Sequence, residues 1–181
     1  MQGFSKSVVR FQYDSSGLLM EDVVADSQRQ DGDDFAMGVH LDDTAHDIVL
    51  RRVTMRNTYS SLGSYWNGDG FASERGVYDV LLEDTTATGA TDAGYDLKSS
   101  ETRLVRTEAS DNKRNYRFWG SDVTVEDCIG GPHRSRGGTG GTAQVWVAPT
   151  GDVELTGCSL EGEDFTVRPG GRMTVDGETI G

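Results

Sequence analysis

The chain repeats one pattern of apolar and polar positions along its whole length, a feature that decides the fold class of a repeat protein. In seven segments of eight residues, the first and third positions are mostly apolar and the fourth and fifth are mostly polar. This alternation predicts a strand, then a bend, then a further inward residue. The segments are 18–25, 48–55, 80–87, 102–109, 123–130, 153–160 and 173–180, with starts 30, 32, 22, 21, 30 and 20 residues apart.

Helices fit this pattern poorly. β-Branched residues are frequent, and Gly or Asp interrupts the apolar runs, which disfavours helices and favours strands and turns. A period of about twenty residues, lengthened in places by about ten, is typical of one coil of a parallel β-solenoid. We therefore expect an all-β fold, a right-handed parallel β-helix of about seven coils, which occupies residues 1–181 as a single domain with long loops at 26–37, 59–68 and 130–142.

A second strand can be placed in each coil, at 9–11, 39–41, 71–73, 95–97, 116–118, 145–147 and 165–167. The two outer residues of each triplet are mostly apolar and are expected to point inward, so the middle residue points outward. Because coils stack about 4.8 Å apart, the middle residues form one outward column. This column is Arg10, His40, Ala72, Asp96, Arg117, Trp146 and Thr166, and a parallel column two residues further on is Gln12, Asp42, Glu74, Lys98, Trp119, Ala148 and Arg168.

This outward face combines acids, bases and two tryptophans. Charged side chains on a strand face are usually only solvated. Large exposed aromatic side chains, however, are uncommon without a partner. We therefore expect a ligand on this face, with Trp119, Trp146, His40 and Glu74 as substrate-binding residues.

The charge of the chain narrows the choice of ligand. Thirty acidic and seventeen basic residues give a net charge of −13, which argues against nucleic acid because phosphate binding depends on Lys and Arg contacts.

No stretch approaches the roughly 18 apolar residues of a membrane helix. The first residues lack the apolar core of a secretory signal, so we expect either a cytosolic chain or part of an exported precursor, and in the second case an extracellular or periplasmic protein.

Cys128 and Cys158 occupy the same repeat position on successive coils. Stacking brings such residues within disulfide reach, but buried cysteines commonly act as small apolar residues, and we expect two free thiols.

Neither end of the chain carries the amphipathic helix that would cap a solenoid. We therefore expect either a fragment of a longer protein or end-to-end self-association.

Two segments carry a resemblance to a known family. Asn67-Gly-Asp-Gly-Phe-Ala72, followed by Thr91-Asp-Ala-Gly-Tyr-Asp96, is similar to paired segments of the calcium-dependent family 9 polysaccharide lyases, which belong to the pectate-lyase-like group of parallel β-helix proteins. The resemblance implies that Asp69, Asp92 and Asp96 occupy calcium-ligand positions. It also implies that Arg117 stands where the family has a Lys, the base that removes the proton α to a uronate carboxylate.

Two differences from the family pattern bear on the chemistry. Ala93 stands where the family has a further liganding Asp, which lowers both the charge and the number of oxygens offered to Ca²⁺. Arg117 replaces Lys, and a guanidinium rarely gives up its proton. On that ground Lys98, in the neighbouring column, is the better base.

The outward face and the resemblance together lead to a functional hypothesis. We expect a polysaccharide lyase-like enzyme that acts by β-elimination on an acidic, uronate-containing polysaccharide, with Arg117 and Lys98 as catalytic residues and Ca²⁺ as a Lewis acid. The alternative is a non-catalytic glycan-binding or structural β-helix module with a degenerate site. Asp69 and Asp92 would then only accept hydrogen bonds from turn amides, and Asp96, Lys98 and Arg117 would form a surface ion-pair cluster.

Overall fold

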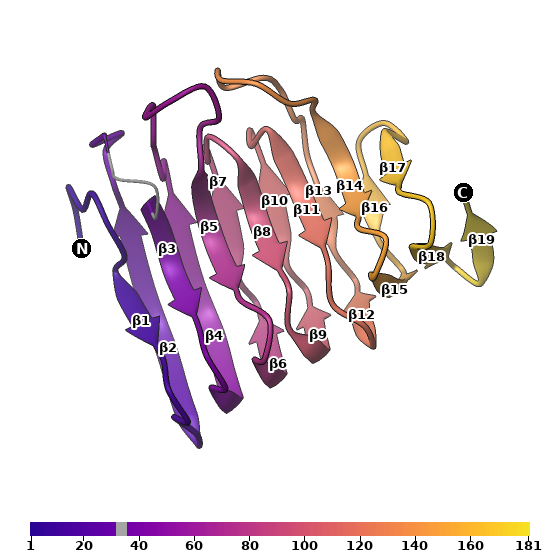
Figure 1. Cartoon of the computed structure of the whole chain (residues 1–181), viewed down its shortest axis with the longest axis horizontal. Helices are drawn as coiled ribbons and strands as arrows, with labels where there is room; N and C mark the ends of the chain where they lie inside the picture. Colours follow the sequence, from indigo (N-terminus) through magenta and orange to yellow (C-terminus); the bar gives the residue numbers. More distant parts are fainter. Residues whose placement is uncertain (32–35) are drawn as a thin grey trace.

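The computed structural model describes residues 1–31 and 36–181, in which all regular structure is β-strand and no helix could cross a membrane. Parallel strands from successive passes of the chain stack along the long axis, so the molecule is solenoid-like and its termini lie at opposite ends (Figure 1). The strands are β1 (Val9–Phe11), β2 (Leu18–Asp26), β3 (Ala36–Leu41), β4 (His46–Arg56), β5 (Gly68–Ser73), β6 (Tyr78–Glu83), β7 (Thr86–Thr88), β8 (Ala93–Leu97), β9 (Ser100–Val105), β10 (Glu108–Ser110), β11 (Arg114–Phe118), β12 (Val123–Glu126), β13 (Ile129–Gly130), β14 (Ala143–Val147), β15 (Asp152–Thr156), β16 (Ser159–Leu160), β17 (Phe165–Val167), β18 (Arg172–Val175) and β19 (Glu178–Ile180).

Seven of these strands form a parallel sheet in the order β1-β3-β5-β8-β11-β14-β17. Its register confirms the predicted outward column, in which each residue pairs with its equivalent on the next pass. The amide of Lys98 donates to the carbonyl of Ser73 at 3.0 Å and that of Trp119 to the carbonyl of Leu97 at 2.8 Å, which continues the ladder into the second column. The paired residues of the first column are Arg10, His40, Ala72, Asp96, Arg117, Trp146 and Thr166.

The other strands form a twelve-stranded sheet, in which β4 pairs with β6 before a bend and with β7 after it. The bend falls at the fifth residue of each repeat segment, as the pattern predicts. A positive φ is costly for a residue with a side chain, and ion pairs between neighbouring bends offset part of this cost, with 2.6 Å between Asp22 and Arg52 and 2.7 Å between Asp84 and Arg106. The bend residues with positive φ are Asp22, Arg52, Asp84, Arg106, Asp127, Gly157 and Gly177.

The C-terminal segment differs from the predicted repeat. β18 and β19 pair antiparallel, with Val175 opposite Glu178. The two residues between them, Asp176 and Gly177, have φ values of 49° and 83°, which suits the Asp-Gly turn favoured in two-residue hairpins. The first half of the seventh segment is confirmed, since β18 pairs parallel with β15 and Met173 lies opposite Val153. A parallel continuation after the bend is a wrong prediction, because the local turn chemistry folds the chain back.

A stack of aromatic rings fills the middle of the core. The ring centroids of Phe71, Tyr95 and Tyr116 are 5.0 and 5.1 Å apart along the stack, and all three side chains are buried. The buried hydroxyls are satisfied, since Tyr95 donates to the carbonyl of Thr85 at 2.9 Å and Tyr116 to that of Thr107 at 3.1 Å. The stack therefore favours one register between passes without leaving an unpaired polar group.

Two long loops meet along one edge of the molecule (Figure 1). The amide of Thr139, between β13 and β14, donates to the carbonyl of Ser64, between β4 and β5, at 2.7 Å. Gly137 packs so closely on Trp66 that a Cβ there would lie 2.1 Å from the ring. The predicted loops at 59–68 and 130–142 are thus confirmed in position, and of the loop predicted at 26–37 residues 32–35 lie outside the described residues.

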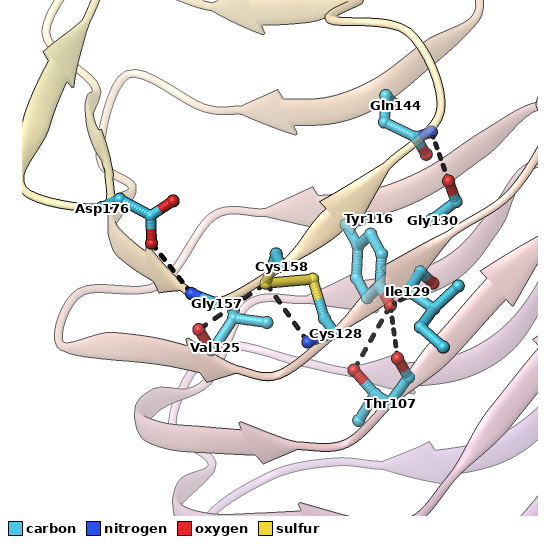
Figure 2. The surroundings of a disulfide bond; sticks show 10 residues. All are labelled: Thr107, Tyr116, Val125, Cys128, Ile129, Gly130, Gln144, Gly157, Cys158 and Asp176. Atoms are coloured by element: carbon cyan, nitrogen blue, oxygen red, sulfur yellow. Dashed lines mark hydrogen bonds between the residues drawn. A yellow bond between two sulfur atoms is a disulfide. The ribbon is translucent and has the colours of Figure 1, made fainter.

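Cys128 and Cys158 form a disulfide between adjacent passes (Figure 2). Their Cα atoms are 4.4 Å apart, since equivalent residues on neighbouring strands lie about 4.8 Å apart. The predicted shared repeat position is confirmed, whereas the expectation of two free thiols is wrong. The register alone brings the two sulfurs together.

Loss of this disulfide should destabilise the protein. The bond closes a segment with a sequence separation of 30 residues, and such a cross-link stabilises by about 3 kcal/mol. We expect the Cys128→Ser, Cys158→Ser double variant to unfold in less urea than the wild type, and only the wild type to respond to a reductant. Two reactive thiols in the unfolded, unreduced wild type would contradict the bond.

Candidate functional site

The outer face of the seven-stranded sheet gathers most of the predicted site residues. Asp96 and Arg117 are paired neighbours in the outward column, and Trp146 follows on the next pass. The side-chain exposure is 6% for Asp96, 14% for Arg117 and 20% for Lys98. This face is therefore a packed polar surface rather than a row of solvated charges.

Asp92 is fully buried at the centre of a cluster of ion pairs. Its Oδ1 accepts a hydrogen bond from Nη1 of Arg114, and its Oδ2 accepts one from Nη1 of Arg117 at 3.0 Å. The hydroxyl of Tyr65 donates to the same Oδ2. Because an uncompensated buried charge costs roughly 3–5 kcal/mol, the two arginines are a structural requirement of Asp92.

Asp96 connects this cluster to the second column. Nε1 of Trp119 donates to its Oδ1 at 2.7 Å, and Nε of Arg117 lies 3.7 Å from the same oxygen. Nζ of Lys98 is 4.0 Å from Oδ2 of Asp96 and 2.6 Å from Oε1 of Glu74. Burial raises the pKa of Asp96, although the charges of Arg117 and Lys98 act in the opposite direction.

Arg117 lies against both tryptophans of the face. Its guanidinium is 4.6 Å from the ring centroid of Trp119 and 5.0 Å from that of Trp146, and the two rings are 4.9 Å apart. Burial works against the charged guanidinium, but the carboxylates of Asp96 and Asp92 raise the pKa of Arg117 above its ordinary value. Arg117 is therefore suited to holding an anion rather than to removing a proton.

Asp69 is fully buried beside the cluster. Its Oδ1 accepts the amide hydrogen bond of Ala93 at 2.8 Å, whereas Oδ2 has no hydrogen-bond partner among the residues that the structure describes. Burial, together with the charges of Asp96 and Asp92, raises the pKa of Asp69 well above its ordinary value. This environment favours the protonated carboxyl. The hydrogen bond from the Ala93 amide is the role that the non-catalytic alternative gives to Asp69, and it accounts for one of the two oxygens.

A Ca²⁺ ion does not fit the described arrangement of these aspartates. Ca²⁺ takes about six to eight oxygen ligands, but within residues 1–31 and 36–181 no three acidic, His or Cys side chains are placed to hold one ion. Both oxygens of Asp92 accept hydrogen bonds from arginines, and Oδ1 of Asp96 accepts one from Trp119. Guanidinium groups thus lie against Asp92 and Asp96, two of the three carboxylates that the resemblance assigns to the metal, and the calcium site stays a prediction.

The remaining predicted residues lie toward the N-terminal end of the face. Glu74 joins the cluster through its ion pair with Lys98. His40 is separated from Asp96 by Ala72 in the column, and it is buried. Burial is the main cause that lowers the pKa of His40.

The repeat pattern marks neither the two cations Arg114 and Lys113 nor Tyr65 as part of the cluster. Arg114 is in register with Ala93 and Ala143, so no repeat position marks it as part of a polar column. Lys113 is buried, with Nζ 5.1 Å from the ring centroid of Tyr65, and burial lowers its pKa. The signal that could have found both is their occurrence as an adjacent basic pair, one pass after Asp92, in a strongly acidic chain.

Comparison of the chain with protein-family models, with curated proteins and with solved structures gives no match. No relative therefore supplies a reaction or a substrate by analogy. The geometry of the cluster and the two motif segments are the observations from which a function can be proposed.

Replacing Asp69 by Asn should stabilise the protein at neutral pH. The raised folded-state pKa means that the folded state binds the proton more tightly than the unfolded state, whose carboxyl has the ordinary value of 3.8. Stability is therefore lost as the pH rises from about 4 through the folded-state pKa. Asp69→Asn keeps an oxygen for the Ala93 amide and carries no charge, so we expect the free energy of unfolding at pH 7 to rise by about 1 kcal/mol or more.

Urea denaturation at a series of pH values measures this effect. The variant should show a weaker pH dependence above about pH 4 than the wild type. Asp152→Asn, at an exposed strand position, is the control and should leave the curve unchanged. A lower stability of Asp69→Asn at pH 7 would show that Asp69 acts as a charged group.

Proposed function

We propose that the protein is a right-handed parallel β-helix of about seven coils that binds an acidic, uronate-containing polysaccharide on the outer face of its seven-stranded sheet and cleaves it by β-elimination. The observation that supports this most strongly is the setting of Arg117, a cation in contact with Trp119 and Trp146 and next to Asp96 in register. The motif segments similar to polysaccharide lyases lie on and beside β5 and β8 of the same sheet.

Recognition of a uronate needs a cation and a flat apolar surface side by side. A guanidinium matches a carboxylate through paired N–H groups, and its attraction is stronger where water is partly excluded. The side chain of Arg117 is only 14% exposed, so its charge acts in such a setting. The rings of Trp119 and Trp146 offer apolar faces on which a sugar ring can pack.

β-Elimination needs the carboxylate to be neutralised, the neighbouring proton to be removed and the leaving oxygen to be protonated. Arg117 meets the first need, because it keeps its charge beside Asp92 and Asp96. Lys98 meets the second as the general base. The positive charge comes from protein side chains, so no step of this proposal involves Ca²⁺.

A location outside the cytosol is part of the proposal. Disulfides form and persist in oxidising compartments and are rare in the cytosol. The Cys128–Cys158 bond joins adjacent passes near the C-terminal end. We therefore assign the protein to an extracellular or periplasmic setting, where polysaccharides are also accessible.

A non-catalytic glycan-binding protein is the second candidate, and one observation favours it. Nζ of Lys98 lies 2.6 Å from Oε1 of Glu74, and an amine engaged in an ion pair is not free to accept a proton from a substrate. The same face would then bind the polysaccharide without cleaving it. The two candidates share the binding site and differ only in turnover.

Cleavage is tested with the purified protein on pectate, alginate and glycosaminoglycans, each with added Ca²⁺ or with a chelator. β-Elimination leaves an unsaturated uronate that absorbs ultraviolet light, so we expect product on at least one polymer. Loss of the base in Lys98→Ala should slow the reaction about a hundredfold or more. Arg103→Ala removes an exposed arginine paired with Glu126 on the other sheet and should keep the full rate.

The outcomes separate the two candidates. Binding without product on any polymer would leave the non-catalytic function, and absence of both binding and product would exclude both. Product formed only with added Ca²⁺ would show that the arginines are not sufficient.

Binding should depend on the tryptophan rings. We expect Trp146→Ala to weaken polysaccharide affinity about tenfold, equal to about 1.4 kcal/mol, because one packing surface for a sugar ring is lost. Isothermal titration calorimetry measures the affinity. Tyr78→Ala, which removes a ring stacked on His46 on the other sheet, is the control. Equal affinities for Trp146→Ala and the wild type would show that the binding site lies elsewhere.

A further inference from the structure

Among residues 1–31 and 36–181, Tyr65 is the one phenol whose hydroxyl joins the ion cluster. It donates a hydrogen bond to Oδ2 of Asp92. It also accepts hydrogen bonds from Nη1 of Arg117 at 3.1 Å and from Nη1 of Arg114 at 3.3 Å. The residue as a whole is 37% exposed, so the phenol can contact both the cluster and a bound molecule.

Two loops hold Tyr65 in this place. It lies in the loop between β4 and β5, and the neighbouring carbonyl of Ser64 accepts the amide hydrogen bond of Thr139 from the loop between β13 and β14. Lys113, the residue before β11, places its Nζ 5.1 Å from the ring centroid of Tyr65. Nζ of Lys113 also donates to the carbonyls of Gly137 and Thr139, which ties both loops to one cation.

Arg117 stands between Tyr65 and Lys98. On one side its Nη1 donates to the Tyr65 hydroxyl, and on the other its Nε lies 3.7 Å from Asp96, whose Oδ2 is 4.0 Å from Nζ of Lys98. A uronate whose carboxylate is held by Arg117 therefore has an amine on one side and a phenol on the other. β-Elimination requires a base and an acid placed in this way.

We propose that Tyr65 is the general acid that protonates the leaving oxygen in the β-elimination, an assignment that rests on the proposed function. Lys98 first gives the proton of its ion pair with Glu74 to water, and its neutral amine then takes the proton α to the carboxylate. The electron pair of the broken C–H bond forms the new C=C bond. The C–O bond to the leaving sugar breaks with its electron pair going to oxygen, which receives the proton of the Tyr65 hydroxyl. The phenolate then regains a proton from water, and the ammonium of Lys98 returns its proton to water.

The surroundings of Tyr65 favour the phenol before the reaction, and two cations offset part of the cost of the phenolate. Burial and the charge of Asp92 raise the pKa of Tyr65, so the phenol is protonated at neutral pH before the reaction. The guanidinium groups of Arg114 and Arg117 already point hydrogen bonds at the oxygen and so stabilise the phenolate once the proton has left. Tyr95 and Tyr116 are fully buried in the core and have no access to a substrate.

The test compares Tyr65→Phe with the wild type on two substrates. One is the polysaccharide that the wild type cleaves, and the other is a uronate with fluoride as the leaving group at the same carbon, which departs without being protonated. We expect Tyr65→Phe to lower kcat about a hundredfold on the polysaccharide with KM nearly unchanged. On the fluoride substrate its rate should equal that of the wild type.

Tyr78→Phe is the matched control, because Tyr78 is 38% exposed on the other sheet and should react as the wild type does on both substrates. Equal losses of Tyr65→Phe on both substrates would show a structural role and overturn the assignment. An undiminished rate on the polysaccharide would overturn it as well, while leaving the proposed function intact. No product from the wild type on either substrate would overturn the proposed function and the assignment with it.

Discussion

The parallel hydrogen-bond register between successive passes is the constraint on which the rest of the molecule depends. Each strand places its residues beside their equivalents about 4.8 Å away, so one alignment decides the contacts between successive parallel strands. It puts Asp96 next to Arg117, stacks Tyr95 on Tyr116 and brings Cys128 to Cys158. A slip by one residue would turn all the inward side chains outward. The core and the charged cluster therefore require the same register.

Within that register, the need to compensate a buried carboxylate determines which cations the site contains. A chain with a net charge of −13 uses two arginines on β11 to compensate one fully buried aspartate, Asp92. The compensation has a chemical consequence, since one of the two guanidinium groups that satisfy Asp92, that of Arg117, is also held as a cation beside Trp119 and Trp146. A rigid cation next to an aromatic face needs little reorganisation to receive an anionic sugar.

The loops add what the repeat cannot supply. Strand residues reach the site in evenly spaced columns, whereas Tyr65 reaches it from the side, carried by a loop that packs on a second loop from another pass. The contact between Gly137 and Trp66 requires the absence of a side chain, because a Cβ would overlap the ring. The glycine-rich loop between β13 and β14 thus packs against the loop between β4 and β5.

The sequence by itself determined the all-β class, the strand positions, the bends and the outward columns. Alternation of apolar residues and recurrence of the pattern are local properties that can be counted along the chain. It also placed Asp96, Lys98 and Arg117 on one side of the fold, because a column follows directly from the repeat. Asp69 and Asp92 were marked only by the resemblance to polysaccharide lyases.

Only the tertiary structure decided which atoms meet. Arg114 stands between Ala93 and Ala143 in the register, so no polar equivalent marks it, and the approach of Tyr65 depends on contacts between distant loops. The disulfide was decided in the same way, by the distance between passes. The C-terminal hairpin, by contrast, follows from the local Asp176-Gly177 turn, which the repeat pattern does not distinguish from a bend. A repeat pattern specifies the spacing of backbones, whereas charge pairing and loop packing depend on three-dimensional distances that no periodicity encodes.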